Sequence, residues 1–281
     1  LILGRAGSGK TEACVREISA RLNADPDKQY ILLTPEQATF VTEKRLLAAF
    51  GGAGGFSVRT LSFRRFVHFV LQARGEGLLP VLDGAGKSLI LRSILEERQS
   101  ELKSYRRVWQ RQGFLEQLLL LMDELRSYRI APEELGRCLA AEDLTWSGFS
   151  HKLEDIRLIY TAYLAALGEG WLDLPGELAL LREKLEDWPP LRTMEFWLDG
   201  FHGFTPAEYQ VIEALLEKDC PVNITLNLPA GGELGSMAEE DVFYPPWETA
   251  GDLRRLCREK GLEALPPLYL EEPSRRRFAA S

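Results

Sequence analysis

Short apolar runs alternate with helical patterns over the first third of the chain. Residues 1–3, 30–34 and 56–60 have the length and composition of β-strands. Between them, apolar positions recur with helical spacing over residues 10–22 and 38–50. A strand, helix, strand, helix, strand order predicts a parallel sheet whose strands are joined by crossover helices.

The middle of the chain has helical spacing almost throughout. Apolar side chains share one helical face over residues 114–125 and another over residues 153–163. No segment of this region alternates between apolar and polar residues with a period of two. The pattern therefore predicts an all-helical subdomain inserted over residues 86–185.

Strand-like runs return in the last third of the chain, at residues 195–200 and 222–228. Between them, residues 205–208 form a capping box with proline at the first helical position, which indicates the start of a helix. We therefore expect an α/β sheet domain that comprises residues 1–85 and 186–281 and is interrupted once by the helical subdomain.

The composition is that of a soluble globular protein. Of the 281 residues, 45% are hydrophobic and 27% are charged. The 34 basic and 42 acidic residues give a formal net charge of −8, which excludes a uniformly basic nucleic-acid coat but not a local basic groove. No apolar run approaches the roughly 18 residues of a membrane span, so we expect no membrane-spanning segment.

The cysteines and the chain ends add two expectations. The four cysteines are scattered, without a Cys-x-x-Cys spacing, which offers no metal cage and indicates a reducing compartment, the cytoplasm. The chain begins with Leu rather than Met and stops soon after the basic residues 275–277. We interpret it as a piece cut from a longer protein.

A phosphate-loop motif follows the first strand-like run. The pattern G-x-x-x-x-G-K-[ST] is matched in full by Gly4, Arg5, Ala6, Gly7, Ser8, Gly9, Lys10 and Thr11. Glycines let successive backbone N–H groups point at a phosphate, and the N-terminus of the following helix adds a partial positive charge. We expect Lys10 to bridge the β- and γ-phosphates of ATP and Thr11 to ligate Mg²⁺. The alternative is a Gly-rich turn that binds no ligand.

The second half of a nucleotide site is expected to be a buried strand that ends in Asp. Asp199 is the best candidate for holding Mg²⁺ through water, and the alternative is an aspartate that caps a turn. In a helicase-type ATPase the next residue is usually Glu, which polarises the attacking water. Here Gly200 takes that place, so no catalytic residue is assigned and little or no ATP hydrolysis is expected. Glu208 is a possible substitute, although it also belongs to the capping box.

Four segments together resemble one known family. Besides the phosphate loop, they are residues 34–40 (TPEQATF), 59–66 (RTLSFRRF) and 198–206 (LDGFHGFTP). The combination resembles the N-terminal region of the AddB (RexB) family, whose members are subunits of the bacterial AddAB helicase–nucleases, and the similarity covers essentially the whole chain. The string D-G-F-x-x-F-T-P is more specific than the phosphate loop alone.

The resemblance implies a RecA-like P-loop NTPase domain of the superfamily 1 helicase type, with its helical subdomain inserted. A second RecA-like domain and a nuclease with an iron–sulfur cluster would follow in the longer protein. An AddB chain would bind ATP and Mg²⁺ without powering unwinding, and an AddA-type partner would be the motor. Such a complex is an ATP-dependent helicase/exodeoxyribonuclease that repairs double-strand breaks, and its AddB chain holds single-stranded DNA and recognises the Chi sequence.

Two loops beside the sheet are the expected DNA contacts, because family members contact Chi through these segments. These loops contain Gln37, Thr39, Phe63, Arg64 and Arg65, and the resemblance implies Chi contacts for all of them except Arg64. Phe201, outside the two loops, is expected to add to the groove. Gln and Thr can hydrogen-bond bases or phosphates, Phe offers a stacking face, and Arg binds phosphate. This chain has His68 where some relatives have Trp. An alternative for Phe63 is a helical core stripe shared with Phe66 and Phe69.

Three further alternatives stay open at this point. The phosphate loop is also compatible with a P-loop kinase or another small-molecule NTPase unrelated to DNA, and with a structural scaffold whose nucleotide site is vestigial. A kinase would need an arginine-rich lid and an acceptor pocket, and the last third of the chain shows neither clearly. Lys103 and the pair Arg106 and Arg107 form either a solvated helix face or a set of DNA backbone contacts.

Overall fold

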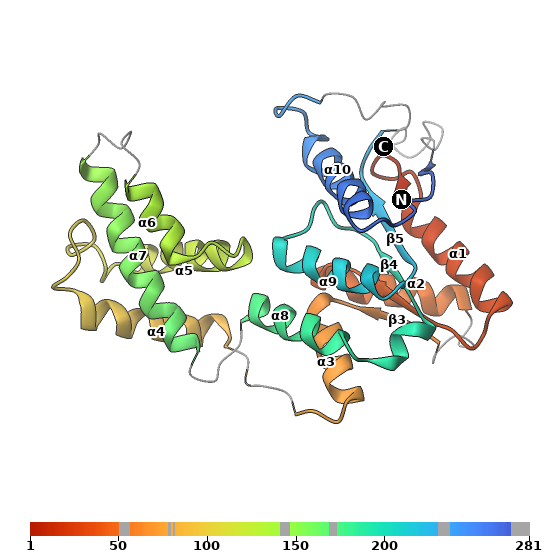
Figure 1. The fold of residues 1–281 in the computed structure, drawn as a ribbon, viewed down its shortest axis with the longest axis horizontal. Helices are drawn as coiled ribbons and strands as arrows, with labels where there is room; N and C mark the ends of the chain where they lie inside the picture. The colour runs from red at the N-terminus through yellow and green to blue at the C-terminus, as the bar shows by residue number, and fades with distance from the viewer. Residues whose placement is uncertain are drawn as a thin grey trace, which may run out of the picture. The chain divides into compact units, whose positions relative to one another are not determined.

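A parallel sheet forms the core of the part of the chain that contains both described ends (Figure 1). The computed structural model describes residues 1–50, 57–77, 80, 82–140, 147–168, 173–229 and 237–270. The sheet has six strands in the order β3-β2-β4-β5-β1-β6, and every pairing is parallel. The strands are β1 (Ile2–Leu3), β2 (Gln29–Leu33), β3 (Val58–Leu61), β4 (Met194–Leu198), β5 (Val222–Leu226) and β6 (Leu268–Tyr269). This arrangement confirms the α/β class and the parallel sheet.

The central strands are apolar because helices cover both faces of the sheet. All five residues of β4 are buried, and Phe196 and Trp197 of this strand point to opposite faces, as the period of two requires. Trp197 belongs to a core cluster with Cys14 and Ile18 of α1 (Lys10–Ala24). Phe196 instead packs edge-on against Phe66 of α3 (Phe63–Ala73), with ring centroids 5.4 Å apart.

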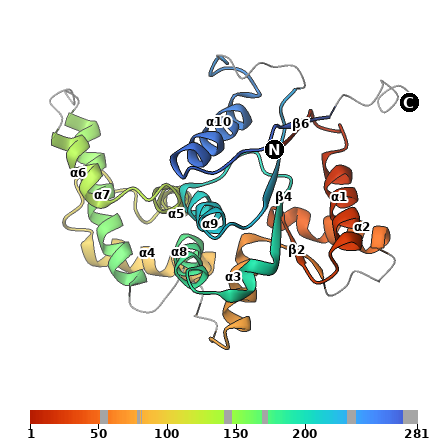
Figure 2. The same cartoon turned by 45° about the vertical axis from the view of Figure 1, so that its right-hand side comes forward.

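Helices flank the sheet in two layers (Figure 2). On the side of Trp197, α1 is accompanied by α2 (Thr39–Phe50), which contributes Leu46 to the same cluster. On the other side lie α3, α9 (Pro206–Glu217) and α10 (Tyr244–Glu259). Two 3₁₀ turns, η1 (Glu36–Ala38) and η2 (Pro189–Thr193), lead into α2 and β4. Right-handed crossovers account for this division between the two faces.

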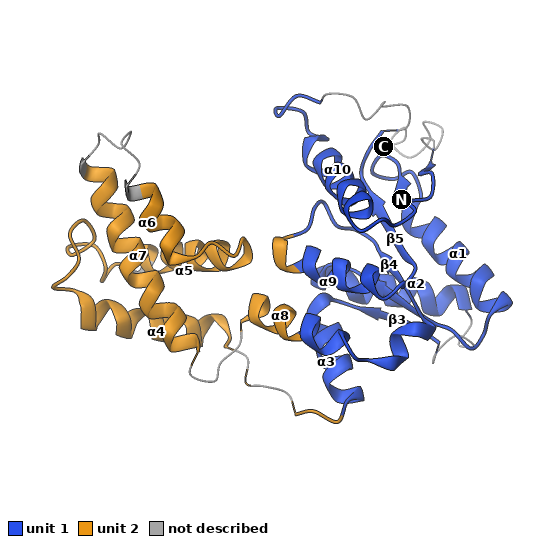
Figure 3. Cartoon of the chain, in the orientation of Figure 1, with its two compact units in different colours: residues 1–74, 181–204, 208–281 blue, residues 75–180, 205–207 orange. Residues whose placement is uncertain are grey.

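The chain divides into two compact units (Figure 3). The sheet unit comprises residues 1–74, 181–204 and 208–281, and the helical unit comprises residues 75–180 and 205–207. The helical unit contains α4 (Gly84–Arg98), α5 (Gln112–Ser127), α6 (Pro132–Ala140), α7 (Ser147–Leu167) and the first part of α8 (Leu174–Leu185). Within its described residues no strand occurs. The helical unit begins at residue 75, whereas helical periodicity becomes clear in the sequence only at about residue 86.

A buried ion pair fastens the end of α5 to the start of α8 within the helical unit. Arg126 donates from Nε and Nη2 to the two carboxylate oxygens of Asp173, at 2.8 and 2.6 Å. The Asp173 side chain is fully buried and also caps α8 by accepting the N–H of Gly176 at 3.0 Å. Burial alone would raise the pKa of Asp173, but the hydrogen bond and charge of Arg126 outweigh it, so the pKa lies below its usual value.

No helix of the described ranges is both long enough and apolar enough to cross a membrane. The longest, α7, has 21 residues and is interrupted by charged side chains such as Lys152, Glu154 and Asp155.

Candidate nucleotide-binding site

The loop between β1 and α1 requires glycine at three of its positions. Gly7 and Gly9 have φ angles of +82° and +88°, a left-handed conformation that other residues adopt only at a cost. A Cβ atom added to Gly4 would lie 2.3 Å from Ser8 Oγ, so a side chain there would collide with the loop. The loop closes through the N–H of Ser8, which donates to the carbonyl oxygen of Arg5 at 3.1 Å. Local sterics therefore explain the glycine pattern of the motif.

Asp199 connects the phosphate loop to the ends of three strands. Its Oδ2 accepts a hydrogen bond from Thr11 Oγ1 at 2.6 Å, and its Oδ1 accepts one from Thr225 Oγ1 at 2.6 Å. The backbone N–H of Asp199 donates to Leu33 at the end of β2 at 3.0 Å. The side chain is 5% exposed, so both carboxylate oxygens are held in a fixed orientation at the carboxyl edge of the sheet. The structure thus brings together Thr11 and Asp199, which are 188 positions apart in sequence.

Lys10 lies folded over its own loop. Its Nζ donates to the carbonyl oxygens of Gly4 and Arg5, both at 2.8 Å. Burial lowers the pKa of Lys10 below its ordinary value, while the negative charge of Asp199 acts in the opposite direction. An incoming phosphate would compete with the two carbonyls for the ammonium group and would replace the solvation that burial removes.

A cavity of about 270 Å³ opens over this loop. It is lined by Ala6, Gly7, Gly9, Lys10, Thr11, Glu12, Arg45, Asp199, Gly200, Phe201, Thr225 and Asn227. The lining combines the backbone of the loop with the ammonium group of Lys10 and the hydroxyl groups of Thr11 and Thr225. The hydroxyl of Thr11 and the carboxylate of Asp199 are hard oxygen donors of the kind that Mg²⁺ prefers. The residues present therefore fit a nucleotide phosphate with its Mg²⁺.

Sequence reasoning missed four of the cavity residues, Glu12, Arg45, Thr225 and Asn227, and two of them show why. Arg45 lies in the middle of α2, the helix that follows β2 along the chain, and lines the cavity from there. Thr225 occupies an apolar strand, where its hydroxyl carries no local signal of a role. Both reach the site only because β2 and β5 flank β4 in the folded sheet.

Gly200 has a backbone conformation that excludes a simple replacement by glutamate. Its φ angle is +85°, and an added Cβ would lie 3.4 Å from Cδ of Pro35. A side chain at this position would be strained by about 1–2 kcal/mol. Glu208 lies in the first turn of α9. In the described structure, the cavity lining contains only Glu12 and Asp199 as carboxylates.

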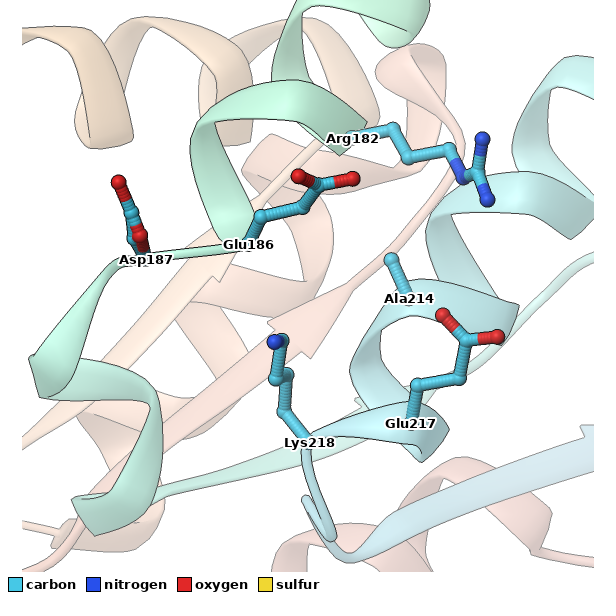
Figure 4. Close-up of a pocket in the computed structure, with 6 residues that line it drawn as sticks. All are labelled: Arg182, Glu186, Asp187, Ala214, Glu217 and Lys218. Carbon is cyan, nitrogen blue, oxygen red and sulfur yellow. The ribbon is translucent and has the colours of Figure 1, made fainter.

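Two other cavities of the sheet unit have different chemistry. One of about 310 Å³ is lined by Arg182, Glu186, Asp187, Ala214, Glu217 and Lys218 (Figure 4). Its charges have both signs, so it offers no positive field to a polyphosphate. The other, of about 540 Å³, lies at the amino ends of β1 and β5, opposite the phosphate loop. In the ranges that the structure describes, no cluster of three or more His, Cys, Asp or Glu side chains could hold a metal ion.

The residues expected to contact DNA divide into two groups. Gln37 in η1 and Arg65 in α3 are exposed, and Arg64 is half-buried. Thr39, Phe63 and Phe201 are only 4%, 4% and 9% exposed.

The three buried residues are held by contacts within the chain, and their direct contact with a strand stays a prediction. Phe63 packs edge-on against Phe201, with ring centroids 5.6 Å apart. Thr39 Oγ1 donates to the carbonyl oxygen of Pro35 at 3.2 Å and accepts from Thr34 Oγ1 at 3.3 Å. The alternative of a core stripe in α3 holds for Phe63 and Phe66. An aromatic residue that sequence reasoning missed, Phe40, is 75% exposed in the first turn of α2.

Comparison with known proteins identifies the family. The whole chain, residues 1–281, matches the family model described as "ADDB, N-terminal". A protein of Desulforudis audaxviator (strain MP104C) is 37% identical over 278 residues, which cover 98% of this chain and 24% of that protein. Proteins of Caldanaerobacter subterraneus subsp. tengcongensis and Symbiobacterium thermophilum are 35% and 36% identical, and each alignment covers 99% of this chain and 24% of the relative.

All three relatives are named as the B-type subunit of an ATP-dependent helicase/deoxyribonuclease. The chain spans about a quarter of their length. The resemblance found in the sequence motifs is therefore confirmed over the full chain, and the chain belongs to the AddB N-terminal family.

Proposed function

We propose that this chain is the ATP-binding and strand-binding part of an AddB-type helicase–nuclease protein, built on a RecA-like P-loop NTPase domain of the superfamily 1 type. The observation that carries the proposal is the hydrogen bond between Thr11 and Asp199 at 2.6 Å, on the wall of a cavity that also contains Lys10. A Gly-rich turn without a ligand would not need a buried carboxylate from a distant strand against its helix N-terminus. Double-strand-break repair, Chi recognition and an AddA-type partner belong to the same proposal, because the relatives are named as one subunit of a helicase/deoxyribonuclease.

Each element of the site has a defined part in binding. The backbone N–H groups of the loop and the Lys10 ammonium would hold the β- and γ-phosphates. Thr11 would ligate Mg²⁺ and Asp199 would hold it through water, and Thr225 keeps the Asp199 carboxylate in place. Bound ATP·Mg²⁺ supplies a phosphoanhydride bond whose cleavage can drive conformational change.

Direct titration with a fluorescent ATP analogue and with labelled single-stranded DNA tests the proposal. Binding of both ligands supports it. A kinase or another small-molecule NTPase would bind the nucleotide and ignore DNA, whereas a scaffold with a vestigial site would ignore the nucleotide. Absence of nucleotide binding at millimolar ATP would contradict the assignment of the loop.

We predict that the chain turns over ATP more slowly than about 1 s⁻¹. It lacks a glutamate after Asp199, and an arginine supplied in trans is alone worth about 10³–10⁵ in rate. Gly200→Glu is expected not to raise turnover, since the positive φ strains the backbone before the carboxylate can be positioned. A steady-state phosphate-release assay measures both proteins, and turnover above about 1 s⁻¹ by the unaltered chain would refute the prediction.

A second prediction concerns the DNA strand. Arg65→Ala is expected to weaken binding of single-stranded DNA and to lower the steepness of log K against log salt by about 0.7, because one phosphate contact is lost.

Two further substitutions test contacts to bases. Phe40→Ala is expected to weaken binding of single-stranded DNA by about 1–3 kcal/mol, the contribution of one base stacked on this exposed ring. Gln37→Ala should leave bulk binding intact and impair the Chi response of the whole complex, since base discrimination needs a base contact.

Arg192→Ala is the matched control for Arg65→Ala. Arg192 is also exposed in the sheet unit, but it lies in η2, before the amino end of β4 rather than at the carboxyl edge. Fluorescence anisotropy at four or more salt concentrations gives the slopes. Identical slopes for Arg65→Ala, Arg192→Ala and the unaltered chain would show that the strand does not pass Arg65.

A further inference from the structure

We propose that the loop between α4 and α5 in the helical unit is a second binding site for the phosphodiester backbone of nucleic acid, formed by Arg106, Arg107 and Arg111. The choice of nucleic acid as the polyanion rests on the proposed function. The site itself rests on three observations about this loop: its positive charge, the hydrogen bonds that hold its backbone, and the lack of acidic partners for its arginines.

The loop is basic within an acidic chain. Residues 102–115 contain four basic side chains and no acidic one, although the chain as a whole has a formal net charge of −8. One of the four, Lys103, is neutralised by Glu154 of α7, with Nζ and Oε2 2.5 Å apart. The positive charge that remains is concentrated on Arg106, Arg107 and Arg111, all of which are exposed.

One buried carboxylate holds the backbone of the loop through hydrogen bonds. Asp155 of α7 is 2% exposed and accepts the N–H groups of Lys103, Ser104 and Tyr105 at 2.8, 2.8 and 2.9 Å. Leu102 is buried in the core of the helical unit. The arginines therefore project from a fixed platform, and binding a partner would not require ordering of the backbone.

Tyr105 connects this platform to the next helix. Its ring packs against Phe114 of α5, with centroids 4.9 Å apart. Its carbonyl oxygen accepts the N–H groups of Val108 and Trp109 at 3.0 and 3.1 Å, which closes a turn that contains Arg106 and Arg107.

Within the described part of the chain, the three arginines have no acidic partner, a property that they share with Arg129 and Arg157 of the helical unit. Arg92, Arg98 and Arg137 each lie within 3.6 Å of a glutamate three or four residues away. Among the residues that the structure describes, no carboxylate lies within ion-pair distance of Arg106, Arg107 or Arg111. Exposed, unpaired guanidinium groups keep their donors available for an external anion.

The chemistry favours a phosphodiester backbone over a lipid surface. Guanidinium groups bind phosphate oxygens in a bidentate manner, and a row of them matches a polymer with one charge per nucleotide. Insertion into a membrane would need exposed apolar side chains, and within residues 102–111, all of which are described, no large apolar side chain is exposed. Contacts to phosphates carry no sequence information, so this site would hold DNA independently of its sequence.

A charge-matched pair of triple variants tests the proposal. The loop variant combines Arg106→Ala, Arg107→Ala and Arg111→Ala, and the control variant combines Arg92→Ala, Arg98→Ala and Arg137→Ala. Both lose three positive charges from exposed positions of the same unit. Anisotropy with a duplex that carries a single-stranded tail is measured over a salt series, together with binding of a fluorescent ATP analogue.

We expect the loop variant to bind this DNA at least about 10-fold more weakly at low salt, with a salt slope smaller by about 2–3, while the control variant changes less than about 2-fold. Equal affinities and slopes for the two variants, with normal DNA binding by the unaltered chain, would overturn the loop site and leave the proposed function intact. No DNA binding by the unaltered chain would overturn both. A loop-dependent affinity for anionic phosphatidylserine vesicles, without one for DNA, would assign the arginines to a lipid surface instead.

Discussion

Lys10→Ala is expected to lower the affinity for ATP·Mg²⁺ by about 30- to 150-fold, which corresponds to about 2–3 kcal/mol. The substitution removes an ammonium group that would donate to phosphate oxygens through charge-assisted hydrogen bonds. In the absence of ligand this group already donates to the carbonyl oxygens of Gly4 and Arg5. The measured loss is therefore the difference between phosphate contacts and these internal contacts. Isothermal titration calorimetry at constant Mg²⁺ gives the value.

Arg16→Ala is the control for this measurement. Arg16 is exposed on the same helix, so the variant has the same net charge but does not alter the cavity lining. We expect its ATP affinity to stay within about 2-fold of the unaltered chain, because a solvated charge outside the cavity is screened at physiological salt. Equal affinities in Lys10→Ala and the unaltered chain would exclude this loop as the phosphate site.

Of the predicted substitutions, removal of Arg126 is expected to lower the free energy of unfolding the most. Arg126→Met leaves the fully buried carboxylate of Asp173 without its cation, and breaking a buried pair in this way costs about 3–5 kcal/mol. Asp173 still accepts the N–H of Gly176 in the variant, so we expect a value near the lower limit. Hydrogen exchange of α5 in the full chain measures the opening of this region.

Two further measurements make this prediction specific. The double variant Arg126→Met with Asp173→Asn removes both charges and keeps an acceptor for Gly176, so it should be more stable than Arg126→Met alone. Arg98→Ala, which breaks an exposed pair with Glu101, should cost less than about 1 kcal/mol. If Arg126→Met unfolds no more easily than Arg98→Ala, the buried pair contributes nothing.

The same pair gives a pH dependence with a defined sign. The pKa of Asp173 is lower in the folded chain than in the unfolded chain, where it is about 3.9. The stability that it contributes is therefore complete above about pH 3.9 and is lost as the pH falls through the folded value. Hydrogen exchange of α5 in the unaltered chain should accelerate over that acidic window, and in the double variant this dependence should be reduced.

The sheet could be predicted from the sequence because its main strands are buried on both faces. Such strands appear as continuous apolar runs, and β2 and β4 are buried at nearly every position. Strand β6 has only two residues, Leu268 and Tyr269, and both are exposed. Neither its length nor its pattern separates it from a loop, so sequence reasoning missed it. Its place in the sheet depends on pairing with β1, a contact between segments far apart in the sequence.

The site was predictable where the signal is local and not where it depends on tertiary packing. The glycines of the phosphate loop are required by backbone conformation, so the motif and its structure correspond. Phe63 and Phe40 show where prediction from the sequence fails. Both lie in the first turn of a helix, but Phe63 is buried against Phe201 and Phe40 is exposed to solvent. Helix orientation decides which ring is available, and one residue type in one sequence context does not reveal it.

The strand order has a consequence for biosynthesis. In the sheet, β1 pairs only with β5 and β6, and β5 begins about 220 residues after β1 ends. At roughly 5–20 residues per second, a ribosome would need about 10–45 s to add that length. During this time β2 and β3 can pair with each other, whereas the strand that carries the phosphate loop has no neighbour. The phosphate loop is therefore translated long before β5 brings Thr225 to the cavity, and under the proposed function ATP would stabilise only a chain that already contains β5.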